Sequence, residues 1–274
     1  MKFDIELVGK VGSMALINRK DNDIDYNIFA RIGRELAPGM IWVSSGATEI
    51  GRLDFIRRNG TPIEEDAASA KTDYAAQGQA ILMQNYRNFI NPNYSVRQVL
   101  VEHVHFNNEK NAQHLREMLL RCPKQNAIPI INYNDAVCET ENMKMEIQEW
   151  MEKKGKVVEC VDNDETAAQI ACLVKSKRLL ILTSAEGIYR DPNDPKTLIK
   201  EIGGKDVYEV LSAIEEAKKS CHGASRAGAN GAFAKLEYVK DAVKNGTEVF
   251  IASSKYSIKN ILEGDAPRTR IGIC

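Results

Sequence analysis

The segment Leu7-Val-Gly-Lys-Val-Gly-Ser13 joins an expected β-strand, residues 3–8, directly to a short turn that carries a lysine. Glycine lets the backbone approach a ligand closely, and successive N–H groups in a turn can bind an anion. Lys10 adds a full positive charge at the same place. The segment therefore predicts either a phosphate-binding turn around Lys10 or an ordinary turn with an exposed lysine.

Outward from this segment, apolar runs alternate with helical patterns. Further short runs rich in Val, Ile and Leu predict strands at residues 41–43, 96–101, 127–131, 178–182 and 248–252. Helical patterns cover residues 26–36, 67–89, 108–121, 165–175 and 232–244. This alternation predicts an α/β fold with an open, mostly parallel sheet sandwiched between helices. Ligands in such folds bind at the carboxyl ends of the strands.

Two details qualify this pattern. Pro129 falls inside the expected strand 127–131, and proline cannot donate to a ladder, so we expect it at a strand end or a non-bonded position. Residues 143–156 are highly charged and predict a solvated helix or a lid.

Composition limits the classes of function. The chain has 274 residues, 43% of them hydrophobic and 27% charged, with a formal net charge of −1. That balance predicts no general attraction to nucleic acid or to anionic membranes. A signal-like N-terminus and a long apolar run are both lacking, so we expect a cytoplasmic protein. The six cysteines are scattered and predict reduced thiols; His103 and His105 alone do not predict a metal site.

Two common phosphate-binding motifs, G-x-x-x-x-G-K-[ST] and G-x-G-x-x-G after the first strand, do not occur. Other polar segments follow or precede the expected elements. Val43-Ser-Ser-Gly-Ala47 follows a strand, and its small residues could let a carboxylate or phosphate reach a serine hydroxyl and backbone donors, or could simply begin a helix. Asn132-Tyr-Asn-Asp135 follows another strand. Asp162-Asn-Asp164 precedes a helix, where an aspartate could serve as an N-cap or have a role in the site.

The last such segment is Gly228-Ala-Asn-Gly-Ala-Phe-Ala-Lys235, a glycine-bearing loop that opens a helix. A helix N-terminus carries about half a positive charge and unpaired N–H groups, so it suits a phosphate. A flexible entry into an ordinary helix is the alternative.

In their order and spacing these segments resemble the amino acid kinase family, and within it the glutamate 5-kinases. The resemblance covers nearly the whole chain. Its motifs are Val8 to Ser13, Val43 to Ala47, Ala75 to Gln79, Ile131 to Val137, Val161 to Glu165, Leu180 to Thr183 with Gly187 to Tyr189, and Gly228 to Lys235.

The resemblance implies that Lys10 and Lys235 are catalytic and that Asp164 organises them. Acceptor binding is implied for Ser45, Gly46, Asp135 and Asn163. Nucleotide binding is implied for Lys10, Gly12, Ser13, Thr183, Ser184, Gly228, Asn230, Gly231 and Lys235. ATP with Mg²⁺ is implied as well, as are an acceptor lobe over about residues 1–175, a nucleotide lobe over about 176–274, and a homo-oligomer, dimer or tetramer.

The expected reaction is ATP-dependent phosphorylation of a carboxylate, first of all that of glutamate to γ-glutamyl phosphate, the opening step of proline biosynthesis. A carboxylate with a pKa of about 4.3 is ionised at pH 7, so it needs no general base. Two lysines and a helix N-terminus would neutralise the transferred phosphoryl group.

The sequence also departs from the glutamate 5-kinase pattern. Residues 136–161 form a longer loop than is typical, Ser184 stands where many members have aspartate, and the phosphate loop reads Asn230-Gly-Ala232 in place of Gly-Gly-Met. The sequence ends at Cys274, so no RNA-binding-like C-terminal domain is expected. Other acceptors therefore stay open: a nucleoside monophosphate, a carbamate or a phosphonate. A non-catalytic sensor of an amino acid or a nucleotide stays open too, as does feedback inhibition by proline.

Overall fold

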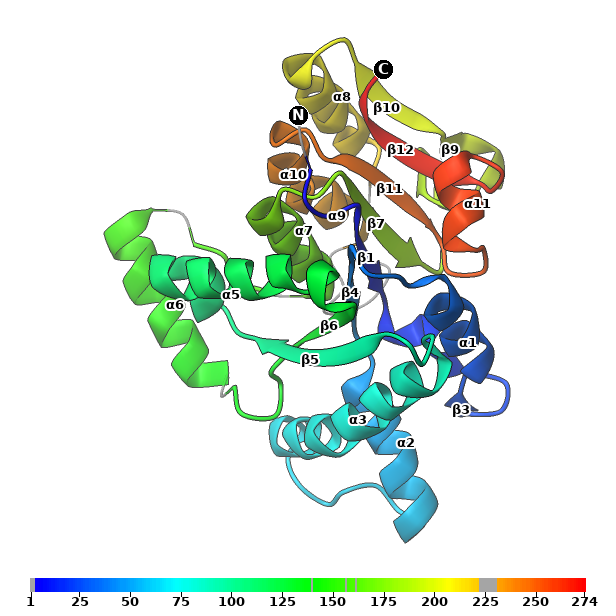
Figure 1. The fold of residues 1–274 in the computed structure, drawn as a ribbon, viewed down its shortest axis with the longest axis vertical. Helices are drawn as coiled ribbons and strands as arrows, with labels where there is room; N and C mark the ends of the chain where they lie inside the picture. The colour runs from blue at the N-terminus through cyan, green and yellow to red at the C-terminus, as the bar shows by residue number, and fades with distance from the viewer. Residues whose placement is uncertain (1–2, 139, 156, 161, 222–230) are drawn as a thin grey trace.

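The computed structural model describes residues 3–138, 140–155, 157–160, 162–221 and 231–274 (Figure 1). Its centre is an eight-stranded sheet with the order β10-β12-β11-β7-β1-β4-β6-β5. Neighbouring strands are parallel except β11 and β12. The strands are β1 (Leu7–Val11), β4 (Met40–Ser44), β5 (Ser95–Val101), β6 (Ala127–Tyr133), β7 (Arg178–Thr183), β10 (Glu201–Gly204), β11 (Glu248–Ser253) and β12 (Arg268–Ile273). The predicted α/β fold with a mostly parallel sheet is confirmed.

Helices cover both faces of this sheet, because alternate strand residues point to opposite sides. In β1, Val8 belongs to one buried core, whereas Leu7 and Val11 belong to the other. The first core contains residues of α5 (Glu109–Arg121), α7 (Asn163–Val174), α8 (Val207–Lys219), α9 (Gly231–Tyr238) and α10 (Lys240–Lys244). The second contains residues of α1 (Tyr26–Glu35), α2 (Ala47–Asn59), α3 (Ala67–Phe89) and α11 (Ile258–Glu263).

The remaining elements are short, apart from one helix. Two small antiparallel pairs are β2 (Ile17–Asn18) with β3 (Asp23–Ile24), and β8 (Ile188–Tyr189) with β9 (Leu198–Ile199). Single turns are η1 (Ser13–Ala15), α4 (Val104–Asn107), η2 (Pro123–Gln125) and η3 (Pro195–Thr197). The charged stretch after β6 forms α6 (Thr140–Lys154), which lies at the outer edge of the molecule, on the left in Figure 1. Among the described residues, no helix combines the length and the apolar character that crossing a membrane requires.

The first strand differs from the expectation for residues 3–8, because β1 begins at Leu7 and continues to Val11. Gly9 and Lys10 therefore lie in a strand and not in a turn. The reason is packing: a Cβ atom on Gly9 would lie 2.0 Å from Cζ3 of Trp42. The glycine at position 9 makes room for the buried indole of Trp42. The close approach of an anion therefore does not explain why glycine stands there.

Other predictions about elements were incomplete. The sequence patterns missed α2, α8, α11, β10 and β12, and the helix expected over 232–244 is divided at Val239 into α9 and α10. Pro129 is the third of the seven residues of β6, so it does not lie at an end. Pairing with β4 begins at Ile130, which leaves the proline outside that ladder.

Two glycines let α2 and α3 pack closely. A Cβ atom on Gly51 would lie 1.8 Å from the carbonyl oxygen of Tyr74, and one on Gly78 would lie 1.8 Å from that of Ala47. Because Ala47 is the first residue of α2, this contact fixes where the helix begins, beside the carboxyl end of β4.

Candidate active site

Two lysines from distant parts of the chain meet at one buried carboxylate. Lys10 Nζ lies 2.6 Å from Asp164 Oδ1, and Lys235 Nζ lies 3.0 Å from Asp164 Oδ2. Lys10 comes from β1, Asp164 from the first turn of α7, and Lys235 from α9. Lys10 and Asp164 are 8% and 4% exposed. The structure thus brings together the three residues for which catalysis was expected.

The start of α7 explains why Asp164 is held in place. Asp162 is the N-cap: its Oδ1 accepts hydrogen bonds from the N–H groups of Asp164, at 2.7 Å, and Glu165, at 3.1 Å. This satisfies two of the free donors at the helix N-terminus and places Asp164 in the first turn, where the helix dipole favours a negative charge. Of the two readings of the Asp162 segment, capping describes Asp162, and pairing with lysines describes Asp164.

The pKa values of Asp162 and Asp164 shift in opposite directions in this environment. Burial raises the pKa of Asp164, but attraction to Lys10 and Lys235 outweighs it, so the net pKa lies below the ordinary value. For Asp162, burial and the neighbouring negative charge of Asp164 both raise the pKa above its ordinary value. The site therefore keeps Asp164 ionised between two ammonium groups.

A polar network extends from Asp164 to the neighbouring strand ends. Asn163 Nδ2 donates to Ser45 Oγ at 2.9 Å and to Asn132 Oδ1 at 3.1 Å. Asn132 Nδ2 donates in turn to Gln79 Oε1 at 2.9 Å. Gly46 follows Ser45 with φ +109°, a left-handed conformation that glycine adopts at little cost. These contacts hold Ser45 and Asn163 side by side, as their shared expected role in acceptor binding requires.

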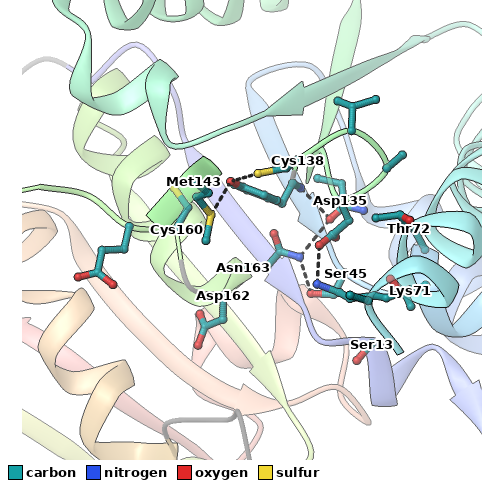
Figure 2. A pocket seen from close by; sticks show the side chains of 18 of the residues that line it. Ser13, Ser45, Lys71, Thr72, Asp135, Cys138, Met143, Cys160, Asp162 and Asn163 are labelled. Carbon is teal, nitrogen blue, oxygen red and sulfur yellow. Dashed lines mark hydrogen bonds and ion pairs between the residues drawn. The ribbon is translucent and has the colours of Figure 1, made fainter. Parts of the chain in front are cut away.

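Ser45, Asn132 and Asn163 line a large cavity (Figure 2). Its volume is about 1420 Å³. Residues expected in the site make up part of the wall: Ser13, Ser45, Gly46, Asp135 and Asn163. Ser13, which was expected on the nucleotide side, thus lines the same cavity as Ser45. Helix α6 supplies another part of the wall, Met143, Lys144, Ile147, Gln148 and Met151.

An ion pair on the cavity wall escaped the sequence analysis. Lys71 Nζ of α3 lies 2.9 Å from Asp135 Oδ1. Both residues line the cavity, and Figure 2 shows them pointing toward the side where Ser45 and Asn163 lie. Lys71 stands in a long helical pattern, where a lysine ordinarily faces solvent, so no local signal marks it.

Helix α6 contacts His103, which lies two positions after the end of β5 and is 3% exposed. His103 Nε2 lies 2.8 Å from Glu146 Oε2, and its ring lies 5.5 Å from that of Trp150, centroid to centroid. Next to it, the hydroxyl of Tyr133 lies 3.1 Å from Cys138 Sγ. His103 therefore serves packing and hydrogen bonding. The six cysteines are free thiols, as predicted.

The residues expected to bind nucleotide lie partly within the described structure. Thr183 ends β7, and Ser184 follows it, exposed. Gly12 adjoins the cluster of Lys10, Asp164 and Lys235, since a Cβ atom there would lie 3.5 Å from Lys10 Nζ. Gly231 begins α9 with φ +61°. Gly228 and Asn230 lie outside the described residues.

Comparison with known proteins places this arrangement in a family. The chain is 31% identical to a glutamate 5-kinase from Streptococcus suis over 91% of its own length and 64% of that protein's. It is 30% identical to a glutamate 5-kinase from Cupriavidus pinatubonensis over 97% of its length and 66% of that protein's. The chain thus spans about two thirds of the length of these relatives.

Solved structures agree in fold. A carbamate kinase from Giardia lamblia bound to AMP-PNP superposes with a TM-score of 0.61 and 14% identity, covering 98% of this chain and 99% of the other. A UMP kinase from Bacillus anthracis superposes with a TM-score of 0.51 and 12% identity, covering 98% and 94%. The model of the amino acid kinase family matches residues 7–253. This chain belongs to the amino acid kinase family.

Proposed function

We propose that this chain transfers the γ-phosphoryl group of ATP to a carboxylate, and that the side chain of glutamate is the acceptor. The observation that supports this most directly is the convergence of Lys10 and Lys235 on Asp164 at the carboxyl edge of the sheet. Two ammonium groups against one carboxylate leave an excess of positive charge, which suits a site for anions. The likeness to proteins named glutamate 5-kinases supports the choice of acceptor.

The chemistry needs charge compensation more than proton transfer. An oxygen of the ionised acceptor carboxylate forms a bond to the γ-phosphorus, and the bond from that phosphorus to the oxygen bridging to the β-phosphate breaks. ADP leaves, an acyl phosphate remains, and no proton moves. Since both reactants are anions, Lys10 and Lys235 would lower the barrier by binding the phosphoryl oxygens and the leaving phosphate.

Asp164 is the positioning element in this proposal. A lysine side chain is flexible, and its charge is poorly placed unless it is paired. The Asp164 carboxylate, which the start of α7 fixes, would hold both ammonium groups in one geometry while the phosphoryl group passes between acceptor and ADP.

We assign nucleotide binding to the part of the chain from about residue 176 onward, with Thr183, Ser184 and Gly231 facing ATP together with Gly12. Acceptor binding then belongs to about residues 1–175. Gly228 and Asn230 stay predicted nucleotide ligands, and a homo-oligomer stays a prediction of the resemblance. Among the described residues, no group of three or more His, Cys, Asp or Glu side chains could hold a metal. We propose that the phosphates of ATP bind Mg²⁺.

The cavity also favours a second candidate, a larger acceptor. Pockets for drug-sized ligands typically measure about 300–1,000 Å³. The cavity here has about 1420 Å³, more than one glutamate occupies, and α6 contributes to its wall. A nucleoside monophosphate is the larger acceptor that this size favours most.

A substrate screen distinguishes the candidates. The purified chain is given ATP, Mg²⁺ and single acceptors, and both ADP release and hydroxamate formation in the presence of hydroxylamine are measured. Glutamate-dependent ADP release with an equal yield of hydroxamate is the expected result. ADP release that requires a nucleoside monophosphate and yields no hydroxamate would replace the proposal with the second candidate. ATP binding without turnover on any acceptor would indicate a sensor.

A further inference from the structure

The ion pair between Lys71 and Asp135 joins two elements at the cavity wall, α3 and the segment after β6. The two side chains are 59% and 24% exposed. An exposed pair of this kind contributes only about 0–1 kcal/mol to stability, so stability alone does not explain it. Its position does suggest a reason, because both charges face the space next to Ser45 and Asn163.

A second electropositive feature faces the same space. Helix α2 begins at Ala47 after Gly46, which has no side chain to cap the first N–H groups. Gly46, Ala47 and Thr48 all line the cavity. Free N–H groups at a helix start attract anions. Glu49 of the same first turn also lines the cavity, but its carboxylate is paired with Arg52. The cavity therefore offers a lysine and a helix N-terminus to a negative group, beside an aspartate that suits a positive group.

We propose that Lys71 is a specificity residue that binds the α-carboxylate of an α-amino acid acceptor, while Asp135 binds its α-ammonium group. The inference rests on the proposed function. A zwitterion replaces the internal ion pair with two new ones, so neither Lys71 nor Asp135 is left unpaired. An acceptor that lacks one of the two groups leaves one charge without a partner, which costs binding energy.

This arrangement predicts how two analogues of glutamate behave. The analogue 4-aminobutyrate keeps the reacting carboxylate and the ammonium group but lacks the α-carboxylate. Glutarate keeps the reacting carboxylate but lacks the ammonium group. Because Lys71 serves only the group that 4-aminobutyrate lacks, and is left unpaired when that analogue takes Asp135, the loss of Lys71 should not weaken the binding of 4-aminobutyrate.

The experiment measures kcat and KM of the wild type, Lys71→Met and Lys71→Arg with glutamate, 4-aminobutyrate and glutarate. For Lys71→Met we expect KM for glutamate to rise about 10- to 100-fold with kcat within twofold, and kcat/KM for 4-aminobutyrate to be no lower than in the wild type. Lys71→Arg should recover most of the loss. Lys124→Met is the matched control, since Lys124 is an exposed lysine in η2, before the N-terminal end of β6.

Two results would overturn the inference. One is an equal loss of kcat/KM on glutamate and 4-aminobutyrate in Lys71→Met, which indicates a general structural effect. The other is the predicted selectivity appearing in Lys144→Met instead, because Lys144 of α6 also lines the cavity. Calorimetric titration of glutamate and 4-aminobutyrate into the wild type and Lys71→Met gives the same comparison without turnover. If the wild type binds glutamate through Lys71 but does not phosphorylate it, the proposed function fails and the inference stands.

Discussion

Lys10, in the second half of the first strand of the sheet, lies 2.6 Å from Asp164, in the first turn of a helix on one face of that sheet. Lys235 pairs with the other oxygen of the same carboxylate, so removing either lysine changes the electrostatic environment of the remaining one. The three residues therefore act as one unit, and their variants should not behave additively.

The first prediction concerns this unit. Lys10→Ala and Lys235→Ala should each lower kcat about 10²–10³-fold, because each removes one positive charge from the transferred phosphoryl group. The double variant should lose less than the product of the two factors. Steady-state ADP release measures this, and circular dichroism with thermal unfolding shows that the variants are folded. Wild-type kcat in either single variant would remove the lysine from the mechanism.

The second prediction concerns Asp162, whose pKa is raised in the folded state. The carboxyl group of Asp162 therefore ionises at a lower pH in the unfolded chain than in the folded chain. Once the pH rises above the ordinary pKa of aspartate, about 3.9, ionisation of Asp162 lowers the free energy of unfolding. Asparagine caps a helix about as well as aspartate. Asp162→Asn should therefore raise the free energy of unfolding at pH 7, and the gain should shrink toward pH 4 in urea titrations.

A matched control exists in α3. Asp66 is also an N-cap, but its pKa is lowered, first of all by a hydrogen bond from Ser69. Ionised Asp66 stabilises the folded chain above the ordinary pKa of aspartate, and this stabilisation is lost as the pH falls through the lower pKa of the folded state. Asp66→Asn should thus destabilise the chain at pH 7, opposite to Asp162→Asn. The same sign for both would show that burial and the charge of Asp164 do not disfavour the ionised form of Asp162.

The parts of the fold that the sequence reveals are those that local pattern determines. Strands such as β4 and β7 are buried on both faces, so they read as continuous apolar runs. Strand β12 does not read as a continuous apolar run, because Arg268 and Arg270 interrupt its apolar residues. Arg270 pairs with Glu201 of β10 and Glu248 of β11, so distant partners stabilise this strand.

The same distinction applies to the site. Lys10, Asp164 and Lys235 stand in short motifs whose order along the chain resembles a known family. Lys71 stands in no such motif, and its partner Asp135 is 64 positions away. Only the packing of α3 beside the end of β6 brings the two charges together, and this depends on contacts that no local window contains.

The third prediction concerns the contact between α2 and α3. In Gly78→Ala the new Cβ atom would lie 1.8 Å from the carbonyl oxygen of Ala47, a backbone atom that no rotamer change can move. We expect a loss of about 1–3 kcal/mol in the free energy of unfolding. The start of α2 should shift as well, raising KM for the acceptor more than KM for ATP. Ala80→Val, on the exposed side of α3, should cost about 0.5 kcal/mol and leave both KM values unchanged.

The last prediction concerns the attachment of α6. Glu146 is 55% exposed and His103 is buried, so Glu146→Ala removes the partner of His103 Nε2 while leaving the core of the sheet intact. Local opening of α6 should become easier by about 0.5–1 kcal/mol, which corresponds to roughly two- to fivefold faster cleavage within residues 140–154 by dilute protease. His114→Ala, an exposed histidine on α5, should leave cleavage unchanged. Because Met143 and Ile147 of α6 line the cavity to which we assign the acceptor, Glu146→Ala should also raise KM for the acceptor without changing kcat at saturation. Faster cleavage with an unchanged KM would mean that α6 takes no part in binding the acceptor.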